Sequence, residues 1–452
     1  MKIIQITPGA GGNFYCENCL RDNALVLELR RLGHETLMVP LYLPAAIDGP
    51  DSTQGVPIFF GGIGTYLREK SALFRKAPAW VDRMLDARPL LKWAARRAEM
   101  TKAKDLGEPL LSMLRGEHGN QVKELDRLVE WLLERGRPDV VCLSNALLAG
   151  LARRLKDALH APVLCTLQDE DGFLDALPQP YRGQAWDILA ARAADVDAFM
   201  PVSRYYAGVM QERLGLPPER VHVVPIGIDF AAYAPAAAPP PAPTIGYLAQ
   251  LRPANGPDLL VEAFLTIRAR GRAAGVRLRL SGAHTPGDKP FVDALHRRVA
   301  QAGADGDVDF LPILSGAAKH EFLRSLSVLS VPARQGVAFG TFVVEALASG
   351  VPVVEPRAGG PAEIVEATGG GRLVAPDDPD ALAAAIEDLL LHPAEARAMA
   401  DRGRRAAADR FSIRRMAENV AGIAVSVEVV SEPLVHGLQA SRGTRKQPGG
   451  RS

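Results

Sequence analysis

The sequence is poor in cysteine, carries almost no net charge and lacks long apolar runs. Four cysteines in 452 residues are too few for a disulfide framework. A net charge of +1 gives no reason to expect nucleic acid as a partner. No apolar run approaches the ~20 residues needed to span a bilayer. The chain enters a strand-like run at Ile3, with no signal peptide ahead of it. We therefore expect a cytoplasmic protein.

The four cysteines favour packing roles over chemistry. Cys142 and Cys165 lie inside apolar, strand-like runs and are typical of buried thiols. Cys16 and Cys19 form a Cys-x-x-Cys at the expected start of a helix, where a thioredoxin-like motif has its thiol pKa lowered. A zinc site needs a second such pair, and the sequence has none. Packing is favoured over a redox or metal role.

Strand-like and helical patterns alternate along the chain, which predicts parallel sheets. A chain of this length fits two domains of about 200 residues each. In the first half, a strand, a glycine-rich turn, a helix and a second strand form a crossover unit that then recurs. Helices are expected at 20–32, 147–159 and 205–214. Strands are expected at 3–7, 36–43, 139–143, 161–167, 198–202 and 221–225.

A proline-rich stretch at 229–244 separates this series from a second one, because its prolines forbid a regular helix or a central strand. The fold predicted is α/β, with two Rossmann-like parallel-sheet domains and a ligand crevice beyond the carboxyl ends of the strands. Strands of the second domain are expected at 244–248, 277–281, 308–311, 328–331, 351–355 and 372–374.

Two segments fall outside the alternation. Residues 67–104 read as a basic helical insertion that includes Phe74, Trp80 and Trp93. Such a helix can lie on an anionic membrane surface, so peripheral membrane contact through 68–104 is an open alternative. A solvated helix whose aromatic residues pack on the domain is favoured. The polar, basic tail at 431–452 is expected to be disordered.

A glycine-rich turn follows the first strand. Gly11 and Gly12 belong to the run 9–12 at a strand-to-helix turn, where bare backbone can approach an anion. A plain tight turn explains the run equally well. The spacing of these glycines differs from a dinucleotide-binding fingerprint. Asp48 and Asp51 also lie too far along the chain from the glycines to be the carboxylate that usually binds the ribose.

The most informative stretch is 338–354. It predicts a loop, a short helix that begins at Gly340 and Thr341, and a buried strand after Gly350. Free amides at the start of that helix can face a diphosphate. Glu345, one turn into the helix, can then reach a sugar hydroxyl of the ligand. The alternative is a core helix whose glutamate faces solvent.

Taken together, these motifs resemble the retaining family-4 glycosyltransferases of the GT-B fold, over roughly residues 1–425. The resemblance rests on the runs 11–12, 32–35, 224–229, 245–248, 339–346 and 359–363. It implies a nucleotide-sugar donor on the C-terminal domain, an acceptor on the N-terminal domain, and no metal or other cofactor. It further implies that a helix at 412–430 returns to the N-terminal domain. The domain limits become 1–229, a linker at 230–243, and 244–411.

The resemblance also assigns donor-site residues and exposes departures. Phe339, Gly340, Thr341 and Glu345 match donor-binding positions. Where the family has an arginine and a lysine that balance the diphosphate, this chain has Gln250 and Asn255, with Arg252 as a nearby substitute. The first glutamate of the family's pair falls at Val337, and Gln168 stands where many members have a catalytic histidine. Lost cations weaken leaving-group stabilisation by ~3–4 kcal/mol, so nucleotide binding can survive where transfer is slow.

Asp169, Glu170 and Asp171 match an Asp-x-Asp metal pattern of the other glycosyltransferase fold. A surface loop is favoured over a metal site, and Asp169 can touch an acceptor hydroxyl.

Three functions stay open. The leading one is retaining transfer of a sugar to a carbohydrate, lipid-linked or other hydroxyl acceptor. The second is a catalytically impaired protein that binds nucleotide or carbohydrate, favoured by the missing cations. The third is a sugar-nucleotide epimerase, which needs acid and base carboxylates of its own beyond Glu345 and Asp169.

Overall fold

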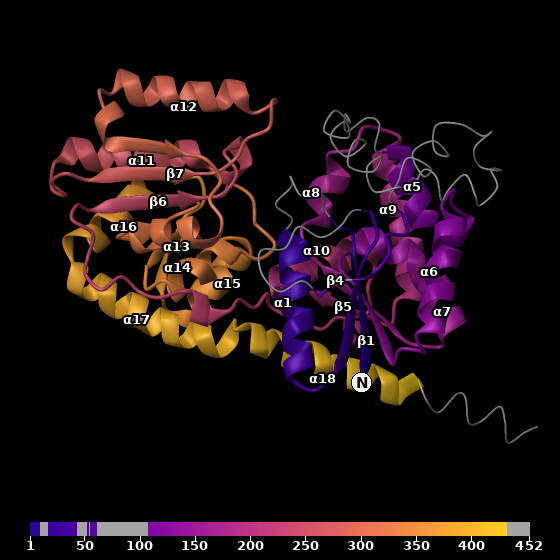
Figure 1. Cartoon of the computed structure of the whole chain (residues 1–452). Coiled ribbons are helices and arrows are strands. Elements are labelled where there is room, and N and C mark those ends of the chain that lie inside the picture. The colour runs from indigo at the N-terminus through magenta and orange to yellow at the C-terminus, as the bar shows by residue number, and fades with distance from the viewer. Residues whose placement is uncertain (10–16, 43–51, 54, 61–106, 432–452) are drawn as a thin grey trace, which may run out of the picture. The chain divides into compact units, whose positions relative to one another are not determined.

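The computed structural model describes residues 1–9, 17–42, 52–53, 55–60 and 107–431 (Figure 1). These residues form two compact units, each built around one sheet. The first unit holds residues 1–200, 210–222 and those from 417 onward, and the second holds 201–209 and 223–416. The expected linker at 230–243 therefore falls inside the second unit.

The sheet of the first unit has five strands in the order β2-β1-β3-β4-β5. The pairs β1–β2, β1–β3 and β3–β4 run parallel. Residues of β3 and β4 are all buried, as in a parallel sheet covered on both faces. The strands are β1 (Lys2–Thr7), β2 (Glu35–Pro40), β3 (Val140–Leu143), β4 (Val163–Leu167) and β5 (Ala198–Pro201).

Helices of the first unit pack in pairs, α5 against α9 and α6 against α7 (Figure 1). Two helices, α10 (Arg204–Leu214) and α18 (Ile413–Ser431), each contribute residues to both units. The remaining helices are α1 (Glu17–Arg31), α5 (Gly107–Arg115), α6 (Val122–Glu134), α7 (Ala152–Leu159), α8 (Glu170–Asp175) and α9 (Tyr181–Arg192).

The sheet of the second unit has six strands in the order β11-β10-β9-β6-β7-β8, and all of its neighbouring pairs are parallel. Because β6 lies centrally and successive strands are added on both sides of it, the sheet is doubly wound. The strands are β6 (Thr244–Leu248), β7 (Arg277–Ser281), β8 (Val308–Leu311), β9 (Val328–Leu329), β10 (Val353–Pro356) and β11 (Gly371–Val374).

The core of the second unit joins β6 and β7 to apolar side chains of α11, α12 and α16. Helices α14 and α15 pack on α17, which runs along them (Figure 1). The helices are α11 (Pro257–Arg270), α12 (Lys289–Gln301), α13 (Gly316–Arg324), α14 (Thr341–Ala348), α15 (Gly359–Thr368), α16 (Pro379–Leu391) and α17 (Pro393–Arg410).

Local sequence explains several helix ends. Proline stands first in α11, α16 and α17, where its missing N–H is not needed. Gly271 ends α11 with a φ of 67°, a left-handed conformation that favours glycine. The side chain of Asp378 accepts the N–H of Ala381 at 2.9 Å and caps α16.

Two expectations about secondary structure are wrong in detail. The run expected as a strand at 221–225 does not form a continuous strand. Val221 makes an isolated bridge to Phe199, and the N–H groups of His222 and Val224 donate to the carbonyls of Phe199 and Pro201 in β5, each at 2.9 Å. The segment expected as one helix at 147–159 begins with a 3₁₀ stretch, Ala146–Leu151, before α7. Within the described part of the chain, no helix is long and apolar enough to cross a bilayer.

Candidate functional site

At the carboxyl edge of the second unit's sheet, loops that follow neighbouring strands pack closely on one another. Gly256, in the loop after β6, has a φ of 65°, and a Cβ there would lie 2.0 Å from the carbonyl oxygen of Pro332. Gly359, after β10, is packed as closely, since a Cβ added there would lie 2.6 Å from the backbone nitrogen of Val337. The glycines therefore let three loops converge at the edge where ligands bind in doubly wound sheets.

Helix α14 begins at this edge. Gly340 precedes it with a φ of 94°, and a Cβ there would meet the ring of Pro361 at 2.7 Å. Phe339 is buried, with its ring edge-on to Phe411 at 5.9 Å between centroids. Thr341 opens the helix. The first amides of α14 lack partners within the helix and carry partial positive charge, which suits a phosphate.

Glu345 lies one turn into α14 and is buried. Its Oε1 accepts hydrogen bonds from the Tyr233 hydroxyl at 2.8 Å and from the Lys319 ammonium at 2.5 Å. Both partners are themselves largely buried. Oε2 makes no hydrogen bond to any described residue. The alternative prediction, a glutamate that faces solvent, is therefore wrong, because the carboxylate of Glu345 is buried and held through Oε1.

An imidazole completes this cluster. His320 packs edge-on to the ring of Tyr233, with 4.4 Å between the centroids. Burial lowers the pKa of His320 below its ordinary value, and the charge of Lys319 lowers it further. The imidazole is therefore neutral near pH 7, which leaves Lys319 as the cation beside Glu345.

The loop 249–256 contains Gln250 and Asn255, the two positions where the family resemblance implies an arginine and a lysine. The Asn255 side-chain amide donates to the carbonyl of Gln250 at 2.9 Å, and Arg252 Nε donates to Asn255 Oδ1 at 3.3 Å. Both Gln250 and Arg252 are exposed. The amide of Asn255 is therefore engaged within its own loop, and Arg252 is the cation that this loop offers.

Glu363, from the last matched motif, has a structural role. Its carboxylate accepts the backbone N–H groups of Tyr205 at 2.5 Å and Arg204 at 3.1 Å. These are the first residues of α10, so Glu363 caps that helix and stabilises its dipole.

Glu355 is a second buried carboxyl at the same edge, at the end of β10. Its Oε1 accepts the N–H of Val331 at 3.1 Å, while Oε2 has no hydrogen-bond partner among the described residues. Burial raises the pKa of Glu355 well above its ordinary value, although the N–H of Val331 acts in the opposite direction. Glu355 is therefore protonated over a wider pH range than an exposed glutamate.

In the first unit, Gln168 follows β4 and is held by a buried guanidinium. Arg21 donates from Nη1 to Gln168 Oε1 and from Nη2 to Asp22 Oδ1 at 2.7 Å and to the carbonyl of Ser144 at 2.9 Å. Its side chain is only 4% exposed. This network fixes Gln168 at the carboxyl edge of that sheet, but an amide cannot act as the base that a histidine would supply.

Asp169 is exposed and adopts a left-handed φ of 57° immediately before α8. The next carboxylate, Glu170, accepts the N–H groups of Ala146 at 3.0 Å and Gln168 at 2.7 Å. Glu170 thus fixes the loop instead of facing a ligand. Where the structure is described, no group of three or more His, Cys, Asp or Glu side chains is placed to hold a metal ion.

Several sequence predictions lie outside the described residues. These are Gly11 and Gly12, predicted from the sequence to bind the donor, the basic segment 67–104, Cys16 and the tail from 432 onward. Cys19, the second cysteine of the Cys-x-x-Cys, is buried and accepts from the Thr7 hydroxyl at 3.8 Å.

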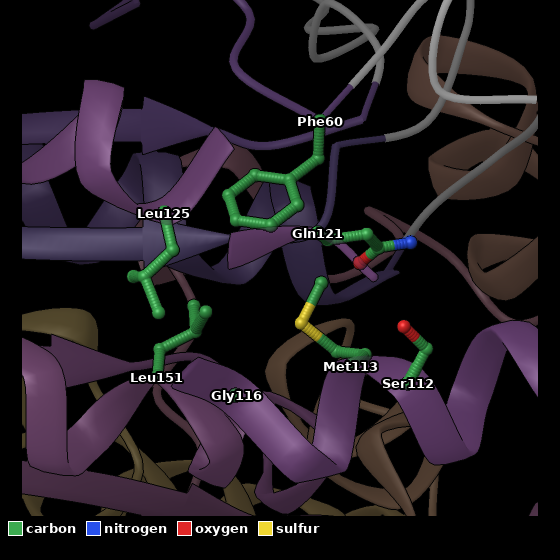
Figure 2. A pocket seen from close by; sticks show the side chains of 7 residues that line it. All are labelled: Phe60, Ser112, Met113, Gly116, Gln121, Leu125 and Leu151. Carbon is green, nitrogen blue, oxygen red and sulfur yellow. The ribbon is translucent and has the colours of Figure 1, made fainter. Parts of the chain in front are cut away.

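A small pocket in the first unit does not look like a ligand site. Figure 2 shows its lining, which includes Phe60, Met113, Leu125 and Leu151 and contains no charged side chain. The space has no room for a water molecule. We interpret it as a packing gap beside α5 and α6.

Sequence reasoning missed four residues that shape these sites. Lys319, Tyr233 and Arg21 gave no signal, since each is an isolated residue far along the chain from its partner. Glu355 did give one. It is a carboxylate that directly follows the apolar run 351–354, at the end of a strand expected to be fully buried.

Comparisons with known proteins agree with this architecture. Residues 60–232 match a family model described as Glycosyltransferase Family 4, and residues 234–406 match one described as Glycosyl transferases group 1. The chain is 29% identical over 232 residues to an MMP alpha-(1->4)-mannosyltransferase of Mycolicibacterium hassiacum, or 51% of this chain and 54% of that protein. It is 32% identical over 215 residues to a D-inositol 3-phosphate glycosyltransferase of Saccharomonospora viridis. That match covers 44% of this chain and 48% of that protein. The chain thus spans about half the length of the curated relatives it matches.

Solved structures show the same fold. Anabaena HepE in complex with UDP superposes with a TM-score of 0.66 at 16% identity, covering 94% of this chain and 100% of that one. Sucrose-phosphate synthase from Thermosynechococcus elongatus superposes with a TM-score of 0.65 at 16% identity. The match covers 95% of this chain and 100% of that one. The fold is therefore that of the glycosyltransferases built from two parallel-sheet α/β domains.

Proposed function

We propose that the protein is a glycosyltransferase that moves a sugar from a nucleotide-sugar donor to a carbohydrate, lipid-linked or other hydroxyl acceptor. We further propose that transfer retains the anomeric configuration and needs no metal. The matches of 60–232 and 234–406 to glycosyltransferase models support the reaction class. HepE, a structural neighbour, has been solved with UDP and with UDP-glucose, so uridine nucleotides are the first donors to test.

The observation that carries the proposal is the arrangement around Glu345. Tyr233 and Lys319 hold Oε1, which leaves Oε2 to accept from a hydroxyl of a bound ribose. The amides that begin α14, one turn away at Thr341, suit the diphosphate of the same molecule. A sugar hydroxyl and a diphosphate about one helical turn apart are the two features that a nucleoside diphosphate presents.

Charge on the leaving group needs compensation in the transition state. In place of cations at Gln250 and Asn255, we assign this role to Arg252, whose guanidinium is exposed in the same loop. We assign acceptor binding to Gln168 and Asp169. Both follow β4 at the carboxyl edge of the first unit's sheet, and both have polar side chains.

A second candidate is a nucleotide- or carbohydrate-binding protein without catalysis. The engaged amide of Asn255 favours it, because this amide cannot replace a lysine without breaking its bond to Gln250. Positions 250, 255 and 337 hold no charged side chain. This candidate retains the Glu345 arrangement and lacks turnover.

Replacing Glu345 with glutamine should weaken nucleoside diphosphate binding at least tenfold. The substitution removes a charge-assisted hydrogen bond to the ribose, worth ~1.5–3 kcal/mol. Isothermal titration calorimetry with UDP, GDP and ADP measures the change. Glu366→Gln is the matched control, because that glutamate is exposed on α15 and forms an exposed ion pair with Arg357. Equal affinities for wild type and Glu345→Gln would remove Glu345 from the donor site.

Replacing Lys319 with methionine should weaken nucleotide binding about fivefold and lower the free energy of unfolding by about 2 kcal/mol. The substitution leaves a buried carboxylate without its cation. Lys319→Arg should restore most of the affinity, since it restores the charge. Lys289→Met is the control, because its pair with Asp293 is exposed on α12 and such pairs contribute about 0–1 kcal/mol. A loss of stability with unchanged affinity would mean that Lys319 is structural only.

A further inference from the structure

A groove lined by arginines lies at the amino-terminal edge of the second unit's sheet. Its volume is about 410 Å³, within the ~300–1,000 Å³ typical of small-molecule sites. Its walls come from the first residues of β6 and β7, the end of α13, and the proline-rich segment 238–242. We propose that this groove binds a phosphate-class anion, such as a pyrophosphate-sized ligand or a phosphate headgroup.

Charge supports this assignment. Arg277, Arg279 and Arg324 line the groove, and Asp309 is the single acidic residue among its lining residues. Three guanidiniums facing one carboxylate leave an excess of two positive charges. Asp309 accepts from Arg277 Nη2 at 3.4 Å and lies 3.5 Å from Arg279 Nε. A concave surface with one sign of charge concentrates counter-ions.

The N–H groups of the groove's arginines also support an anion site. Arg279 donates from Nη1 to the hydroxyl of Ser325 at 2.6 Å, and its buried Nε faces Asp309 Oδ2 at 3.5 Å without a hydrogen bond in the described structure. The guanidinium of Arg324 is exposed and forms no ion pair with a described carboxylate. Each arginine presents five N–H groups in a fork that matches phosphate oxygens. The groove therefore holds more donors than its own acceptors can satisfy.

The opposite wall limits what can bind. Pro239, Pro240 and Pro241 have no backbone N–H, so they offer shape without competing donors. Backbone bonds already tie this segment to the sheet, since Arg277 N donates to the carbonyl of Pro243 at 2.8 Å and the Thr244 hydroxyl donates to that of Ala242 at 2.9 Å. An anion held by the arginines would lie against this proline-rich wall.

This groove is distinct from the donor site. Arg277 stands at the first position of β7, whereas α14 begins beyond the carboxyl ends of the strands. The five residues of β7 separate the two edges by about 15 Å at 3.3 Å per residue. One phosphate group cannot occupy both positions, so the groove is a second, independent anion site.

Site-resolved arginine modification of the full chain tests the proposal. Inorganic pyrophosphate should slow the reaction of phenylglyoxal with Arg277 and Arg324 at least threefold, as read by mass spectrometry of their peptides. Arg402, exposed on α17, should react at the same rate with or without pyrophosphate. This readout is local, so pyrophosphate at the donor site does not produce it.

Variants separate the two sources of the anion. The double change Arg277→Gln with Arg324→Gln should weaken pyrophosphate binding at this groove at least tenfold, and Arg402→Gln should not. Vesicles of phosphatidylcholine with and without phosphatidic acid form the second arm. Arginine-dependent sedimentation with phosphatidic acid, without protection by free pyrophosphate, assigns the groove to a headgroup. The proposal fails if neither pyrophosphate nor phosphatidic acid protects Arg277 and Arg324 more than Arg402.

Discussion

Turnover should rise about 100-fold when the combined changes Gln250→Arg, Asn255→Lys and Val337→Glu are introduced. The first two place positive charge in the loop after β6, where the diphosphate is proposed to lie. Loss of one transition-state donor costs two to three decades in rate, so restored cations should recover a similar amount. Affinity for the nucleoside diphosphate should rise only several-fold, because the leaving-group charge is greatest in the transition state.

Two of the three positions have room for the new side chains, whereas Asn255→Lys also removes the hydrogen bond from the Asn255 amide to the carbonyl of Gln250. Gln250 is exposed, Val337 is half-buried, and the carbonyl of Val337, which accepts the N–H of Gly360 at 2.8 Å, is unaffected by its side chain. Gln301→Arg, at the exposed end of α12, is the control for added charge alone. Donor hydrolysis at matched saturation gives the rates.

Each result of the triple variant has one meaning. Tighter binding without turnover by either protein establishes the binding-protein alternative. Unchanged affinity shows that positions 250, 255 and 337 do not surround the phosphates. A wild type that is already fast, with no gain in the variant, assigns the cationic role to Arg252 or Lys319.

Replacing Glu355 with glutamine should make the protein more stable at pH 7 and flatten the pH dependence of its free energy of unfolding. Burial raises the pKa of Glu355 above its ordinary value near 4.5, so the folded protein keeps a proton that the unfolded chain releases. The stability contribution of this group is therefore fully present below about pH 4.5. Above that, it is lost at about 1.4 kcal/mol per pH unit until the pH passes the folded pKa.

Urea denaturation at several pH values between 5 and 8 measures this difference. Glutamine keeps the shape of Glu355 and cannot ionise, so it can still accept from Val331. Glu395→Gln on the exposed face of α17 should leave both stability and slope unchanged. Parallel slopes for wild type and Glu355→Gln would show that Glu355 is ionised in the folded protein.

The fold followed from the sequence because its signals are local. Apolar runs of three to eight residues, separated by segments with helical periodicity, located the strands of both sheets, and proline and glycine located many of the helix ends. The strand expected at 221–225 was wrong in its regularity, because an apolar run predicts an extended backbone but not how completely it pairs. In the structure, this run has one isolated bridge, at Val221, and the N–H groups of His222 and Val224 donate to carbonyls of β5.

The site was harder to predict because it depends on contacts between distant residues. The sequence pattern located Glu345 on its helix, but nothing near it in sequence indicates Lys319 on α13 or Tyr233 before β6. The same holds for Arg21, whose hydrogen bond to Gln168 joins helix α1 to the end of β4. For Asn255, the sequence showed only that it replaces a lysine of the family. The structure adds that its side-chain amide donates to the carbonyl of Gln250 in its own loop.

The most direct test of the proposed function is a donor screen with the unmodified protein. UDP-, GDP- and ADP-sugars are incubated with the full chain, release of the nucleoside diphosphate is followed, and proton NMR records the anomer of the product. We expect turnover of at least one donor with retained configuration, and a higher melting temperature with the matching free nucleotide. Failure to turn over any donor, with no nucleotide raising the melting temperature, would contradict both the transferase and the donor site built on Glu345.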